Sequence, residues 1–219
     1  EISECLVGSE MCIRDRGNPY FYGLSSHENV EIKLYNKANP LKPWKTMGRM
    51  HDKYLIADGK IYILGGRNTY NYFLGDFPGH KNFDRDVLVV CDEPQKDNSV
   101  NQLWNYFETI WEQEDCRYFH NSKKLADRQS VKKAVLELQE GYQQYFEVNK
   151  EKICDTDYAD ETFETEKIIL LSNPIHTQAK EPVVWYQLGE LMKNAKERVK
   201  IHTPYIICND MMYNTCLLY

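Results

Sequence analysis

A histidine and a lysine separated by one residue, His51 and Lys53, stand at the start of an extended apolar run that ends at Asp58-Gly59. An imidazole can act as a nucleophile or a general base, and an ammonium group donates hydrogen bonds to anionic oxygens. A second run rich in Ile, Leu and Tyr follows the Asp-Gly pair. Asp-Gly between two such runs is a strong signal of a β-hairpin, so we predict that a hairpin positions both side chains.

The predicted hairpin also determines which side chains share a face. With Asp58 and Gly59 as the two central turn residues, His51 lies opposite Gly66. Because side chains alternate faces along a strand, Lys53 and Asn68 fall on the same face as this pair. Asp58 falls on the opposite face, where it shapes the turn. The shared face thus offers a nucleophile, two hydrogen-bond donors and a small residue, a combination that suits a phosphate group.

The spacing of the whole motif is more specific than the His-x-Lys pair or the Asp-Gly turn alone. His-x-Lys, four residues, Asp, six residues and Gly-Gly-x-Asn is the signature of the phospholipase D superfamily. This sequence fills every place in it, with His51, Lys53, Asp58, Gly65, Gly66 and Asn68. By this resemblance the chain is α/β, with a phospholipase D-like mixed β-sheet flanked by helices and truncated at both ends. Gly-Gly-Arg-Asn followed by Tyr-Phe most resembles the cardiolipin-synthase-like and related phosphatidyltransferase sequences of bacteria.

The resemblance implies phosphodiester transfer that uses no metal and no cofactor. In the superfamily, one motif histidine attacks phosphorus and forms a phosphohistidine. A second histidine protonates the leaving alcohol and then activates water or a lipid hydroxyl. By this analogy His51 is the nucleophile, Lys53 and Asn68 bind the phosphate, and Gly65-Gly66 leave room for it.

A further acidic candidate follows the hairpin. Within residues 82–90, the Val-Leu-Val-Val run at 87–90 indicates a buried strand preceded by Asp84 and Asp86. The resemblance implies that an acid at this place orients the histidine from the opposite half of the site, and Asp84 fits the family pattern better than Asp86. A carboxylate there would hold one imidazole tautomer and stabilise its protonated form; two solvated acids at a strand end are the alternative. The predicted catalytic residues are therefore His51, Lys53, Asp58 and Asp84.

Hydrophobic periodicity predicts the other elements. In chain order they are a loop at 17–28, a strand at 29–35, a helix at 99–113, a second helix around 131–145, a strand at 167–172, a helix at 182–197 and a strand at 198–207.

An acidic linker divides the predicted fold. Residues 17–150 form the C-terminal part of a first phospholipase D-like half, 151–166 the linker, and 167–209 the start of a second half. The segments 1–16 and 214–219 resemble translated sequencing-adapter read-through, and the fold prediction leaves them out. No other histidine is followed two residues later by lysine. We therefore expect the partner motif to lie outside this chain.

Charge and cysteine content limit the partners. The net charge of −6 speaks against a general nucleic-acid binder, whereas residues 42–67 carry six Lys and Arg against two Asp, a local charge of +4 that suits an anionic substrate. The seven cysteines form no C-x-x-C pair, which is typical of a reducing compartment, and no apolar run is long enough to span a membrane. We expect an anionic phospholipid as partner, at the cytoplasmic surface of the cell membrane.

Three functions remain open from the sequence. They are a phosphatidyltransferase of the cardiolipin-synthase type, a nuclease or other phosphodiesterase of the same superfamily, and a non-catalytic fragment or scaffold module. We expect this chain alone to be inactive as a monomer, because loss of one member of an acid-base pair costs about two to four powers of ten in rate.

Overall fold

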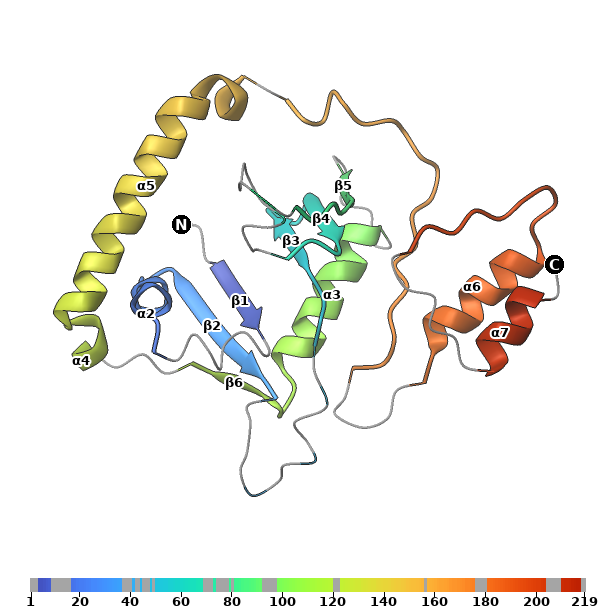
Figure 1. Cartoon of the computed structure of the whole chain (residues 1–219), viewed down its shortest axis with the longest axis horizontal. Coiled ribbons are helices and arrows are strands. Elements are labelled where there is room, and N and C mark those ends of the chain that lie inside the picture. Colours follow the sequence, from blue (N-terminus) through green and yellow to red (C-terminus); the bar gives the residue numbers. More distant parts are fainter. Residues whose placement is uncertain are drawn as a thin grey trace. The chain divides into compact units, whose positions relative to one another are not determined.

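The computed structural model (Figure 1) describes residues 4–8, 17–36, 41, 44, 48, 50–68, 73, 79, 81–91, 98–119, 123–155, 157–175, 181–203 and 210–217. The chain forms two compact units, Glu1–Ile169 and Leu170–Tyr219. The first unit contains two three-stranded sheets with helices, so the predicted α/β class is confirmed. Among the described helices, none combines the length and the hydropathy needed to cross a lipid bilayer.

The first sheet has the strand order β1-β2-β6. Its central strand β2 (Val30–Tyr35) confirms the strand predicted at 29–35. On one side β1 (Glu4–Gly8) pairs with β2 in parallel, and on the other β6 (Cys116–Tyr118) pairs antiparallel. Strand β1 belongs to the segment that the sequence prediction leaves out of the fold. In the structure those five residues complete the sheet.

Helix α2 (Pro19–Ser25) occupies the segment predicted as a loop, so that prediction is wrong. The Asn18 side chain accepts the backbone N–H of Tyr20 at 2.9 Å, and Pro19 takes the first helical position. Both features favour the start of a helix. The prediction failed because the same Asn, Pro and Ser residues that mark loops also begin and end short helices.

Helix α5 (Gln129–Cys154) packs against α2. Its first turns bury Val131 and Ala134. Gly23 of α2 allows the close approach, since a Cβ atom there would lie 2.8 Å from a methyl group of Val135. A short helix, α4 (Lys123–Ala126), precedes α5 and contacts both helices.

The second sheet is an antiparallel meander of β3 (Tyr54–Ala57), β4 (Ile61–Gly65) and β5 (Asp86–Val90). It contains the predicted hairpin and the strand predicted at 87–90, which begins one residue earlier, at Asp86. Alternation along these strands buries Tyr62 on one face.

The turn between β3 and β4 differs from the prediction by one residue. Asp58 and Gly59 both have positive φ, at 53° and 64°, as expected of an Asp-Gly turn. The N–H of Lys60 donates to the carbonyl of Ala57 at 3.0 Å and closes it. Lys60, however, also lies outside the strands, and Ala57 therefore pairs with Ile61. Every pair along the hairpin is shifted accordingly.

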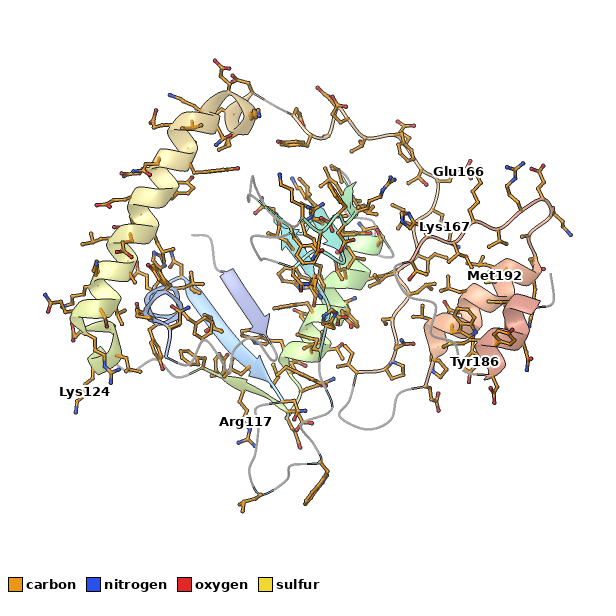
Figure 2. The ribbon with its side chains drawn as sticks, in the orientation of Figure 1. Arg117, Lys124, Glu166, Lys167, Tyr186 and Met192 are labelled. Atoms are coloured by element: carbon orange, nitrogen blue, oxygen red, sulfur yellow. The ribbon has the colours of Figure 1, made fainter. Side chains whose placement is uncertain are left out.

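Helix α3 (Ser99–Trp111) confirms the helix predicted at 99–113 and connects the two sheets of the first unit. Its buried residues are Ser99, Val100, Leu103 and Ile110. Near its start, the hydroxyl of Tyr62 donates to Oγ of Ser99 at 3.2 Å. At its end, Nζ of Lys33 donates to the carbonyl of Trp111 at 2.6 Å. Figure 2 shows the side chains of β3–β5 gathered against this helix.

The second unit contains α6 (Val183–Lys193) and α7 (Asp210–Leu217), which contact each other. Helix α6 confirms the helix predicted at 182–197 but ends earlier, at Lys193. Its Tyr186, labelled in Figure 2, is half exposed. Met192 lies in its last turn (Figure 2).

Two predicted strands are wrong where the structure describes them. Residues 157–175 have no helix or strand, and neither do 198–203; residues 204–207 lie outside the described part. An apolar run becomes a strand only when another strand pairs with it. The predicted linker also begins within α5, since residues 151–154 are helical, and the boundary between the units follows Ile169.

Candidate functional site

His51 and Lys53 lie directly before β3 and are in contact. Nζ of Lys53 is 2.9 Å from Nδ1 and 3.3 Å from Nε2 of His51, and it donates to the His51 carbonyl at 2.7 Å. The imidazole is exposed and the lysine half-buried. Because an ammonium group has donors only, the ring nitrogen that it contacts acts as an acceptor. The structure thus brings together the predicted nucleophile and the predicted phosphate-binding cation.

The shifted register changes which residues share their face. The N–H of Gly65 donates to the carbonyl of Lys53 at 3.2 Å, so Lys53 lies opposite Gly65 and alternation places Gly66 on the other face. The predicted pairing of His51 with Gly66 is therefore wrong by one position. Asn68 is exposed, and no hydrogen bond among the described residues joins it to His51 or Lys53.

The glycine pair makes room for two carboxylates. A Cβ atom at Gly66 would lie 2.6 Å from Oδ2 of Asp84. At Gly65 it would collide with Asp86, the residue directly opposite on β5. The space predicted for a phosphate beside these glycines is therefore filled by protein side chains.

Arg67 holds both of these acidic residues and was not among the predicted site residues. Its Nε donates to Oδ2 of Asp86 at 2.6 Å, and its Nη2 donates to the carbonyl of Asp84 at 2.9 Å. Nη1 donates to the carbonyl of Phe73 at 2.9 Å. Its signal in the sequence is its position inside Gly-Gly-Arg-Asn, between the predicted glycine pair and Asn68.

The two acids differ in what their carboxylates contact. Asp86 is paired with Arg67, and its Oδ1 is buried without a hydrogen-bond partner among the described residues. Asp84 accepts the backbone N–H of Arg85 at 2.8 Å. Burial lowers the pKa of Lys53, and the charges of Asp52 and Asp84 oppose that shift. Of the two predicted acids, Asp84 is the one whose charge acts on Lys53, after the stronger effect of Asp52. Its role in orienting a histidine of the opposite half stays a prediction.

Asp52, between the two candidate residues, is bound to helix α3. The hydroxyl of Tyr106 donates to Oδ2 of Asp52 at 2.6 Å, and the rings of Tyr54 and Tyr106 meet edge to face with centroids 6.2 Å apart. Burial raises the pKa of both phenols above the ordinary value of 10.0; the next cause is the hydrogen bond to Asp52 for Tyr106 and the Asp52 charge for Tyr54. Tyr106 therefore remains a hydrogen-bond donor at neutral pH. This contact could not be predicted, because period-two alternation indicates only the face on which Asp52 lies.

Asp58 is exposed in the turn, with the whole of β3 between it and His51. This position and its positive φ fit the role in shaping the turn. Among the described residues, no group of three or more His, Cys, Asp or Glu side chains is placed to hold a metal ion.

Comparison with known proteins gives one relative and no family. The chain matches no protein-family profile and no solved structure. It is similar to an uncharacterized protein of Helicobacter pylori, with 24% identity over 217 aligned positions that cover 86% of this chain and 40% of the relative. The chain therefore spans about 40% of the length of the relative that it matches. At this identity the similarity assigns no family.

Proposed function

We propose that this chain supplies one half of an active site for phosphodiester transfer, with His51 as the nucleophile and Lys53 as the phosphate-binding cation. One observation carries the proposal: Nζ of Lys53 lies 2.9 Å from Nδ1 of His51, on an exposed edge of the second sheet. Partial burial of the lysine supports it, since an ammonium group that has lost part of its hydration attracts an anion more strongly.

The proposed substrate is an anionic phospholipid at the cytoplasmic surface of the cell membrane, where the protein acts peripherally as a phosphatidyltransferase. The resemblance of the Gly-Gly-Arg-Asn segment to cardiolipin-synthase-like sequences supports this class. The local charge of +4 over residues 42–67, within a chain of net charge −6, supports an anionic ligand at the hairpin.

The proposed reaction has two displacements. A ring nitrogen of His51 attacks phosphorus, and the bond from phosphorus to the leaving oxygen breaks. That oxygen takes the bonding electron pair and a proton from a histidine of the partner half. Water or a lipid hydroxyl then gives up its proton to the same histidine and displaces the imidazole. Lys53 would stabilise the charge on the phosphoryl oxygens, and Asp84 would orient the incoming histidine.

A substrate that needs no acid tests this half site. Bis(p-nitrophenyl) phosphate loses p-nitrophenolate, a stable anion that leaves without a proton. We expect the chain to form a covalent p-nitrophenylphosphoryl adduct on His51, detected by mass spectrometry of the intact protein and its peptides. The adduct should be absent from His51→Ala.

His27→Ala is the matched control for this experiment. His27 is another exposed histidine of the first unit, and its ring accepts the N–H of Asn29 at 3.2 Å. This variant should form the adduct at the wild-type rate. An adduct that persists in His51→Ala, or none in the wild type, would contradict the proposed nucleophile.

A further inference from the structure

The segment that carries the candidate residues precedes the regular part of β3. The strand pairs begin at Tyr54, and the last ladder hydrogen bond joins the carbonyl of Lys53 to the N–H of Gly65. Beyond that point the direction of the chain depends on side-chain contacts. The side chain of Asp52, next to Lys53, makes such a contact with Tyr106, at a separation of 54 residues.

The Tyr106 end of this contact belongs to a packed helix. Tyr106 lies in the middle of α3, whose Leu103 and Ile110 are buried. Its ring also packs against Tyr54, the first residue of β3. The hydroxyl is 2.6 Å from the carboxylate, as in a charge-assisted hydrogen bond. Asp52 is therefore held against a well-packed helix.

We propose that Tyr106 is a positioning residue for the candidate site: by holding Asp52 on α3, it keeps His51 and Lys53 turned to the opposite side of the chain, where they bind a phosphate group. The alternation of side chains in an extended segment is the physical link between the two sides. The phosphate part of this inference rests on the proposed function, whereas the positioning part concerns the free protein.

Electrostatics agree with the geometry. The Asp52 carboxylate is the largest influence that keeps Lys53 charged against the effect of burial on its pKa. Moving Asp52 away from its place would therefore change the electrostatic surroundings of Lys53 as well as the positions of His51 and Lys53. A contact that only stabilised the fold would not have this effect.

The chain offers a matched control at the same interface. Tyr62 also donates its hydroxyl to a side chain across the boundary between the second sheet and α3, to Ser99 at 3.2 Å. Tyr106→Phe and Tyr62→Phe each remove one hydroxyl and one hydrogen bond between these elements. Only the first releases Asp52.

Nitrogen NMR of the isotope-labelled chain tests the inference. The signals are the ring nitrogens of His51 and the Nζ of Lys53, recorded in the free protein and during titration with inorganic phosphate. In Tyr106→Phe we expect all three signals to shift in the free protein and the Kd for phosphate to rise about tenfold, because the charge-assisted hydrogen bond from Lys53 weakens when its geometry is lost. In Tyr62→Phe the signals should stay in place and the Kd should change by less than about twofold, because His51 and Lys53 keep their places.

Two results would overturn the positioning role: wild-type signals in Tyr106→Phe, or equal shifts in both tyrosine variants. A thermal unfolding curve of each variant verifies that both are folded. A wild-type chain whose His51 and Lys53 signals do not respond to phosphate would instead refute the proposed function, while the free-protein signals would still decide the role of Tyr106.

Discussion

Two lysines of the first unit, Lys33 on β2 and Lys53 before β3, show how the same side chain serves different purposes. Lys33 is only 9% exposed; its Nζ donates to the carbonyl of Trp111 at 2.6 Å and lies 4.4 and 4.6 Å from the ring centroids of Trp111 and Tyr118. Lys53 is half-buried, and its hydrogen-bonding partner is the exposed His51 two residues away.

The difference lies in the partners rather than in the lysines. A carbonyl at the end of a packed helix and two aromatic rings are fixed groups, so the Lys33 ammonium is committed to the fold. The partner of Lys53 is a neighbouring side chain at the surface, which an anionic ligand can displace at small cost. A candidate binding lysine is thus recognised by contacts that a ligand can replace.

The largest expected effect is the loss of the buried lysine. Lys33→Ala should lower the free energy of unfolding by about 3 kcal/mol, because it leaves the Trp111 carbonyl unsatisfied and empties the space between the rings. Urea denaturation measures this. The nitrogen NMR signals of His51 should be unchanged in the folded fraction. A variant as stable as the wild type would contradict the structural role of Lys33.

The complementary change, Lys53→Ala, should leave the free energy of unfolding within about 0.5 kcal/mol, as is usual for a substitution near the surface. Phosphate affinity should instead fall about tenfold or more, since a hydrogen bond to a charged group contributes about 1.5–3 kcal/mol. Calorimetric or NMR titration with inorganic phosphate checks this. A large loss of stability with unchanged phosphate binding would assign Lys53 to the fold, like Lys33.

Arg67 extends the comparison to a third cation. Its three hydrogen bonds reach Asp84, Asp86 and Phe73, so it should behave like Lys33 although it lies next to the candidate site. Arg67→Ala should lower the free energy of unfolding by about 2 kcal/mol, because it leaves the partly buried Asp86 carboxylate without its ion pair.

The matched variant Arg67→Lys separates charge from geometry. Lysine keeps the positive charge but cannot reproduce the planar fork that reaches three acceptors. We expect it to recover less than half of the lost stability in urea denaturation. Full recovery would mean that charge alone connects this residue to the acids.

The smallest effect concerns alkaline pH. The pKa of Tyr106 is raised above its ordinary value of 10.0, so the unfolded chain loses the phenolic proton at a pH where the folded chain keeps it. The stability from this group is therefore complete below pH 10.0 and declines as the pH rises above that value. Urea midpoints at a series of pH values should fall less steeply above that pH in Tyr106→Phe than in the wild type, and equal slopes would contradict a buried, hydrogen-bonded phenol.

Local signals account for the parts of the fold that the sequence predicted well. Positive φ at Asp58 and Gly59 is a property of those two residues, and the apolar spacing of Leu103 and Ile110 lies within one helix. The candidate pair His51 and Lys53 is only two residues apart, so one extended segment is enough to bring them together.

The wrong register and the wrong strand predictions have one cause: both features depend on residues elsewhere in the chain. The additional turn residue Lys60 shifts the register, and the choice of that register depends on pairing along the whole of β3, β4 and β5. The strand predicted at 167–172 has the right composition, but no described strand lies beside it. Pairing partners, unlike turns, cannot be read from a short window.

By itself, the sequence determined the hairpin, its Asp-Gly turn, helices α3 and α6, and the proximity of His51 to Lys53. Only the tertiary structure decided that Tyr106 holds Asp52, which is 54 residues away in the sequence. It also decided that Lys33 binds the end of α3 at Trp111, 78 residues away. The first group depends on backbone preferences and periodicity within a few residues. The second depends on which surfaces pack together, and packing is a property of the folded chain as a whole.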